Sequence, residues 1–145
     1  MQGAIGLAQL KKLPKFIEAR RQNFDKLKQG LSDLQDKLIL PEACSDSMPS
    51  WFGFLITVKE GVDRNLLVQH LEENGIQTRM LFAGNLLKHP CFDDMRKTNH
   101  GFRTVSELKN TDIVMNNTFW IGVYSGMTDA KIDYMINSFK EFFNK

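Results

Sequence analysis

The chain has 145 residues, of which 42% are hydrophobic and 25% are charged. Its 19 basic and 17 acidic residues give a net charge of +2, too small and too dispersed to indicate a nucleic-acid-binding protein. No apolar run is long enough to span a membrane and no basic leader follows Met1, so we expect a cytoplasmic protein. The two cysteines, Cys44 and Cys91, lack metal-site spacing and fit a reducing compartment.

The first part of the chain predicts two helices. Residues 2–12 are rich in Ala, Leu and Gln, and we expect a break at Pro14, because proline suits the first turn of a following helix. The second helix should run from about Pro14 to about Leu34, with Gly30 marking an alternative, earlier end. Apolar residues recur along it every seven positions, at Ile17, Phe24 and Leu31.

Three apolar, β-branched or aromatic segments predict strands, at residues 51–58, 76–81 and 118–123. Helical patterns separate and follow these strands. The sequence therefore predicts an α+β fold of two layers, with about three strands and helices packed on one face of the sheet.

The predicted helices of this second part have clear boundaries. Asp63 is a good N-cap for a helix that ends at Asn74-Gly75, and Thr128 caps a final helix. Between them we expect a short helical turn at residues 92–95 and a longer helix at residues 104–115.

The sequence lacks a hydrolase triad, a phosphate loop and a zinc-ligand pattern, so we predict no catalytic, cofactor-binding or metal-binding residue. Arg79 ends the second predicted strand, and a loop with Asn85, Lys88 and His89 follows it. An arginine fork binds carboxylate or phosphate, and an asparagine can orient a hydroxyl group. These four residues form the predicted binding site for an anionic, hydroxyl-bearing substrate. In the alternative interpretation, Arg79 points to solvent from an edge strand.

Three segments together carry a family resemblance: residues 1–13 with Arg20-Arg21 behind them, residues 75–90, and residues 116–123. They resemble the C-terminal portion of the DegT/StrS-type sugar aminotransferases, which are vitamin B6-dependent enzymes of the aspartate-aminotransferase fold. The run from Arg79 to Leu86, followed by His-Pro, is similar to the branch of CDP-4-keto-6-deoxy-D-glucose 3-dehydrases of lipopolysaccharide biosynthesis. Ser125 departs from the family, which commonly has proline there.

The resemblance implies that residues 1–37 are connecting helices and residues 38–145 the α+β small domain, without the large cofactor-binding domain. It implies a parent enzyme that uses pyridoxamine or pyridoxal phosphate to remove the sugar 3-hydroxyl of a CDP-linked deoxyhexose, on the way to the 3,6-dideoxyhexoses of O-antigen. In that branch a [2Fe-2S] cluster passes electrons from a partner reductase. Cys44 and Cys91 do not match its clustered cysteines, so no iron ligand is assigned.

On this interpretation the chain supplies part of a nucleotide-sugar site, and we expect the isolated chain to hold no cofactor and to be inactive. Its natural partners would be the large domain, a homodimer partner and the reductase. Three alternatives remain open, one of which is a stand-alone ligand-binding domain. The chain is the small domain of a true sugar aminotransferase, or it is a non-catalytic truncated product that acts only by association through its apolar N-terminal helix.

Overall fold

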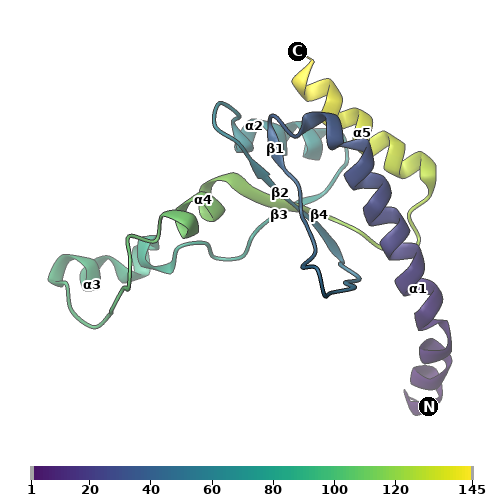
Figure 1. Cartoon of the computed structure of the whole chain (residues 1–145). Helices are drawn as coiled ribbons and strands as arrows, with labels where there is room; N and C mark the ends of the chain where they lie inside the picture. Colours follow the sequence, from purple (N-terminus) through teal and green to yellow (C-terminus); the bar gives the residue numbers. More distant parts are fainter. Residues whose placement is uncertain (1, 145) are drawn as a thin grey trace.

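The computed structural model describes residues 2–144 and contains a four-stranded antiparallel sheet (Figure 1). Its strands are β1 (Leu38–Ile39), β2 (Gly53–Val58), β3 (Thr78–Met80) and β4 (Thr118–Gly122). The strand order is β1-β2-β4-β3, so β4 lies between β2 and β3, both of which precede it in the chain. The predicted α+β class is confirmed, and β1 is an addition to the expected strands.

One face of the sheet is buried and the other is open, because side chains alternate along each strand. In β2, Phe54, Ile56 and Val58 are buried, whereas the residues between them are half-buried. Phe119 and Ile121 of β4 lie opposite Ile56 and Phe54 and extend the same buried face. The other face is therefore the more accessible one, and its β2 residues are half-buried.

The buried face packs against α1 (Gln2–Gly30), α2 (Arg64–Glu73) and α5 (Asp129–Phe143). Figure 1 shows α1 and α5 side by side, and the two helices are in contact. Helix residues of this core are Phe24, Leu27, Leu67, Leu71, Ile132 and Phe139, and Leu31 joins them from the turn after α1. The prediction that the helices pack on one face is confirmed.

The predicted caps of α2 and α5 are in place. The carboxylate of Asp63 accepts hydrogen bonds from the N–H groups of Asn65 and Leu66, at 2.8 and 3.1 Å. The hydroxyl of Thr128 accepts from the N–H of Lys131. Each bond satisfies an amide that the first helical turn leaves without a partner.

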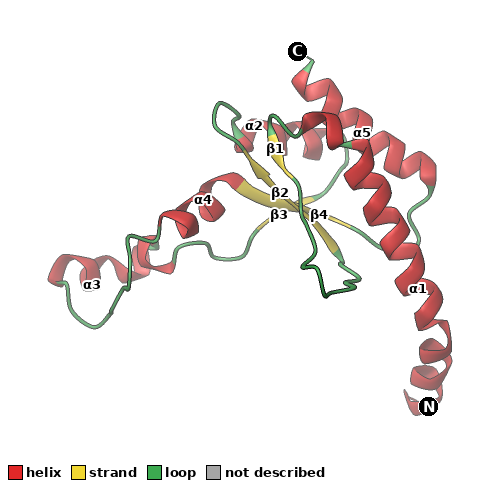
Figure 2. Ribbon diagram, in the orientation of Figure 1, coloured by secondary structure: helices red, strands yellow, loops and turns green. Residues whose placement is uncertain are grey.

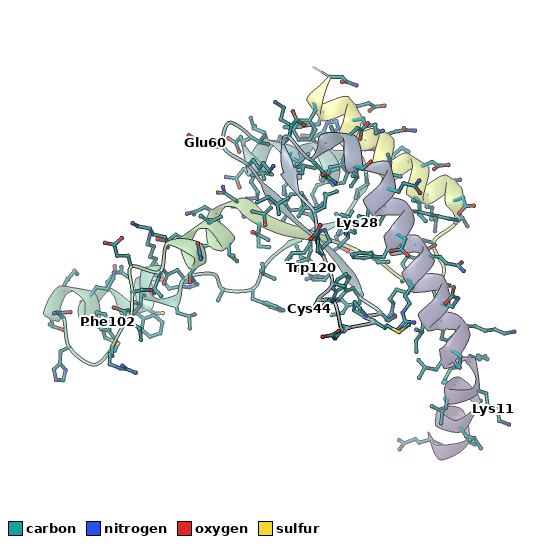
Figure 3. The ribbon with its side chains drawn as sticks, viewed as in Figure 1. Lys11, Lys28, Cys44, Glu60, Phe102 and Trp120 are labelled. Atoms are coloured by element: carbon teal, nitrogen blue, oxygen red, sulfur yellow. The ribbon has the colours of Figure 1, made fainter. Side chains whose placement is uncertain are left out.

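The predicted break at Pro14 is wrong, because α1 continues through Pro14 without interruption. It ends at Gly30, the earlier of the two expected ends. The half of α1 before Ile17 is exposed on all sides and extends away from the sheet, as Lys11 shows in Figure 3. No helix in residues 2–144 is long and apolar enough to cross a bilayer.

Residues 84–117 form an arm that projects from the sheet on the side opposite α1 (Figure 2). The arm contains two 3₁₀ turns, η2 (Leu86–Lys88) and η3 (Pro90–Phe92), and two helices, α3 (Asp93–Thr98) and α4 (Lys109–Asn117). The helix expected at residues 104–115 thus begins at Lys109 and ends later than predicted. Leu108 precedes it with a φ of 53°, a left-handed conformation that a helix cannot include.

Candidate functional site

Arg79 lies on β3, which is an edge strand of the sheet. It is paired with Trp120 of β4, and directly opposed residues project from the same face. Trp120 is labelled near the centre of Figure 3. The Arg79 side chain is exposed, and within the described residues its guanidinium has no hydrogen-bond or ion-pair partner. Five donors are therefore free to bind a ligand.

A hollow of about 490 Å³ adjoins Arg79, and we call it the Arg79 hollow. Its polar lining includes Lys131 and Tyr134 of α5 and Tyr124 of the turn after β4. The ammonium of Lys131 lies 3.3 Å from the hydroxyl of Tyr124, and the hydroxyl of Tyr134 donates to the carbonyl of Asn74 at 2.9 Å. The lining has two cations and no carboxylate, so the hollow suits an anion.

Glu72 of α2 fixes the start of β3. Its carboxylate accepts hydrogen bonds from the backbone N–H and the hydroxyl of Thr78, at 2.6 and 2.7 Å. These two bonds, together with the nearby charge of Arg79, hold the pKa of Glu72 below its usual value near 4.5. The ionised carboxylate therefore orients the strand that presents Arg79.

Asn85 is buried at the base of the arm and bonds to two segments. Its side-chain oxygen accepts from the N–H of Leu87, and its side-chain amide donates to Asp112 at 2.8 Å. The ammonium of Lys88 donates to the other oxygen of Asp112, also at 2.8 Å. Hydrogen bonds from Lys88 and then Asn85, with the charge of Lys88, hold the pKa of Asp112 below its usual value near 3.8.

His89 closes the same loop. Its Nε2 bonds to the carbonyl of Ala83, and because a carbonyl only accepts, Nε2 carries the proton. Gly84 has a φ of +64°, and a Cβ there would lie 2.6 Å from Cγ of Met115. The loop thus needs glycine for both its backbone conformation and its contact with α4.

The structure brings three of the four predicted site residues together and leaves the fourth apart. Asn85, Lys88 and His89 form internal bonds at the base of the arm, whereas the Arg79 hollow is lined by none of them. Lys131 was missed, because only the docking of α5 brings it near Arg79. Trp120 was missed as a partner of Arg79 because the pairing depends on strand order.

The two cysteines lie in different parts of the fold. Cys44 is exposed in the loop between β1 and β2, as labelled in Figure 3, and Cys91 is exposed in η3 of the arm. Within residues 2–144, no group of three His, Cys, Asp or Glu side chains is arranged to hold a metal ion.

Comparison with known proteins places the chain in a family. The model of the DegT/DnrJ/EryC1/StrS aminotransferase family matches residues 1–140. The chain is 52% identical to the lipopolysaccharide biosynthesis protein RfbH of Salmonella typhimurium, over 99% of this chain and 32% of that protein. It is 46% identical to the dTDP-4-dehydro-2,6-dideoxy-D-glucose 3-dehydratase of Saccharopolyspora spinosa, over 100% of this chain and 30% of that enzyme.

Solved structures agree in fold. The E. coli GDP-4-keto-6-deoxy-D-mannose-3-dehydratase with bound hydrated PLP superposes with a TM-score of 0.77 at 30% identity, over 94% of this chain and 34% of that one. An aminotransferase from Psychrobacter cryohalolentis gives a TM-score of 0.80 over 99% of this chain and 38% of that one, with 17% identity. The chain thus spans about a third of these relatives, and it belongs to the DegT/DnrJ/EryC1/StrS aminotransferase family.

Proposed function

We propose that this chain is the small domain of a nucleotide-sugar 3-dehydratase of lipopolysaccharide biosynthesis and forms one wall of its substrate site. The observation that carries the proposal is the 52% identity to RfbH over 99% of the chain. The names of the other relatives pair the same region with 3-dehydratases of dTDP- and GDP-linked deoxysugars. A related structure contains GDP-perosamine, which is a nucleotide sugar.

In this proposal Arg79 binds the diphosphate of the substrate. It is an exposed guanidinium that bonds to no side chain or carbonyl of residues 2–144, at a hollow that Lys131 also lines and that has no carboxylate in its lining. Asn85 shapes the loop beside the site, and Lys88 and His89 hold that loop through Asp112 and Ala83. CDP-linked deoxyhexose is our proposed substrate for the parent enzyme.

Pyridoxal or pyridoxamine phosphate is the proposed cofactor of the parent, since related structures contain PLP. That cofactor would supply the carbanion chemistry, and its ring nitrogen is partnered by an Asp or an Arg side chain. The Arg79 hollow has no carboxylate among its lining residues, and its arginine binds the diphosphate in this proposal, so no residue of this hollow is assigned to the cofactor. The remaining two-thirds of the parent would hold it.

Three further partners belong to this proposal: the large domain, a second subunit and a reductase that would feed a [2Fe-2S] cluster. Cys44 and Cys91 are exposed, unpaired and in separate parts of the fold, so neither is assigned to that cluster. Unpaired exposed cysteines support a cytoplasmic location for the parent.

A chimera tests the proposal. The matching segment of Salmonella RfbH is replaced by this chain, and sugar 3-dehydration is measured with CDP-4-keto-6-deoxyglucose. We expect an active chimera, because the two segments are 52% identical over 99% of this chain. A folded chimera that transfers an amino group without dehydration would support the aminotransferase alternative instead.

Arg79→Ala in the chimera should lower kcat/KM by about 10- to 150-fold, the loss expected for a charge-assisted hydrogen bond. Arg103→Ala is the matched control, since Arg103 is exposed on the arm, away from the Arg79 hollow. Unchanged kinetics for Arg79→Ala would remove Arg79 from the substrate site.

A further inference from the structure

Trp120 lines two hollows, one at the edge of the sheet beside β3 and α5 and the other over β2 and β4. Strand pairing places Leu55, Trp120 and Arg79 in one row across β2, β4 and β3. On one side of Trp120 is the Arg79 hollow, and on the other is an apolar trough of about 360 Å³ that Trp120 also lines. A single ligand could thus reach both hollows by crossing this indole.

The indole of Trp120 is held in a defined position. A Cβ at Gly53 would lie 2.8 Å from Cε3 of Trp120, so the ring lies directly over this glycine. Phe52 meets the same indole edge to face, with ring centroids 5.5 Å apart and an interplanar angle of 89°. This arrangement is favourable for aromatic pairs and holds the ring as a rigid platform.

The trough beside this platform is aromatic and aliphatic, and we call it the aromatic trough. Its large apolar side chains are those of Trp51, Phe52, Leu55, Leu81, Phe82 and Trp120, and Pro41 and Gly53 complete the apolar lining. Glu42 is the charged residue of the lining. A planar base needs an apolar face on which to stack, and this lining provides one.

Phe82 adds a second indication of a ligand. Its φ of 48° is a left-handed conformation that a bulky residue rarely adopts, and its side chain is 84% exposed. Backbone strain of this kind costs about 1–3 kcal/mol and is concentrated at functional sites. The strained backbone presents an aromatic ring at the trough instead of burying it in the core.

We propose that the aromatic trough stacks the nucleobase of a nucleoside diphosphate whose phosphates lie against Arg79 and Lys131. Trp120 is the platform between the two groups. The inference rests on the proposed function, and it adds the position of the base and the residues that bind it. The cationic Arg79 hollow complements the diphosphate, and the apolar trough complements the ring attached to it. Because stacking tolerates any base, CDP and GDP should bind with similar affinity.

The test uses the chain itself with three probes: CDP, GDP and inorganic pyrophosphate. Binding is followed by NMR through the indole N–H resonance of Trp120, which is assigned from its loss in Trp120→Phe. We expect both nucleotides to shift this resonance and to bind at least about fivefold more tightly than pyrophosphate, because only they bring a base.

Variants separate the two hollows. Trp120→Ala should weaken CDP binding by about 5- to 100-fold, whereas Trp120→Phe should retain most of the CDP affinity. Pyrophosphate binding should fall by no more than about twofold in Trp120→Ala, because Trp120 lines the Arg79 hollow but brings no charge to the phosphates. Gly53→Ala keeps the indole but displaces it, so CDP binding should fall there too. Arg79→Ala should weaken all three probes. Unfolding midpoints confirm that each variant is folded.

Two results would overturn the inference, and they differ. If CDP and pyrophosphate bind equally and Trp120→Ala changes neither, the base does not occupy the trough, while the phosphate site of the proposed function stands. If none of the probes binds, the phosphate site fails together with the trough.

Discussion

Asp112 joins the two chain segments that meet at the base of the arm. One of its oxygens accepts from the amide of Asn85 and the other from the ammonium of Lys88. Both donors were predicted to contact substrate, yet they bind a carboxylate of their own chain. The sequence does not predict that Asp112 accepts hydrogen bonds from Asn85 and Lys88. Asp112 is 27 residues from Asn85 and lies in the first turn of α4, so only the fold brings them together.

Protonation of Asp112 should loosen this junction. A carboxyl group whose pKa is lower in the folded than in the unfolded chain stabilises the fold above the unfolded value, near 3.8 here. This stabilisation is lost as pH falls through the lower, folded value. We expect Asp112→Asn to lower the urea midpoint at pH 7, and the difference from the parent chain to shrink as the pH falls below 3.8.

Glu60→Gln serves as the control for this prediction. Glu60 is exposed in the turn after β2, so its substitution should leave the midpoint nearly unchanged at pH 7. A difference between Asp112→Asn and the parent chain that stayed constant as the pH was lowered would show that the charge of Asp112 is not what holds the junction.

Secondary-structure elements were predictable where the signal is local. The caps Asp63 and Thr128 and the aromatic and β-branched composition of β2 are local signals, and both caps and the strand are present. Strand β1 was missed because it has only two residues and exists through pairing with Val58 and Thr57. Packing and pairing across the chain determine such elements, and a single sequence does not display them.

The arm should depend on the contact between its loop and α4. Gly84→Ala would place a Cβ 3.2 Å from the backbone Cα of Met115 and closer still to its side chain, in a left-handed conformation. Gly61→Ala has the same backbone penalty, at a φ of +86°, but meets no atom within 4 Å. We expect about 1 kcal/mol of destabilisation for Gly61→Ala and a further 1–3 kcal/mol for Gly84→Ala.

Urea unfolding of the two variants measures this difference directly. Equal losses would mean that Met115 moves aside and that the arm is not held by this contact.

At the scale of the whole molecule, a compact core carries two projections, the arm and the first half of α1 (Figure 1). The core was predictable in kind, since α+β patterning and one helix-covered face followed from periodicity. The positions of the arm and of the first half of α1 relative to the core could not be predicted, because they depend on contacts between distant parts of the chain. The pairing of Arg79 with Trp120 likewise required the strand order β2-β4-β3.

The first half of α1 should mediate self-association of this chain. Leu10 and Leu13 are 63% and 44% exposed, and they continue the spacing of the buried residues further along the helix. We expect size-exclusion chromatography with light scattering to show concentration-dependent association. The double variant Leu10→Glu/Leu13→Glu should abolish it without changing the unfolding midpoint.

The matched control is Ala8→Glu/Gln9→Glu, which adds the same charge to neighbouring exposed positions of the helix. If both double variants dissociate equally, charge repulsion and not the leucine stripe governs the association. A strict monomer at high concentration would contradict the prediction and the alternative that the chain acts by association.

Pro14 has a mechanical consequence for α1. Proline has no N–H to give to the carbonyl of Leu10, so one rung of the hydrogen-bond ladder is missing near the middle of a 29-residue helix. Helix α1 should therefore bend most easily near Pro14, just before its residues enter the core. We expect a force on the first three turns to bend α1 near Pro14. The hydrogen bond between Asn23 and the carbonyl of Tyr124, which lies beyond the bend, should then stay in place.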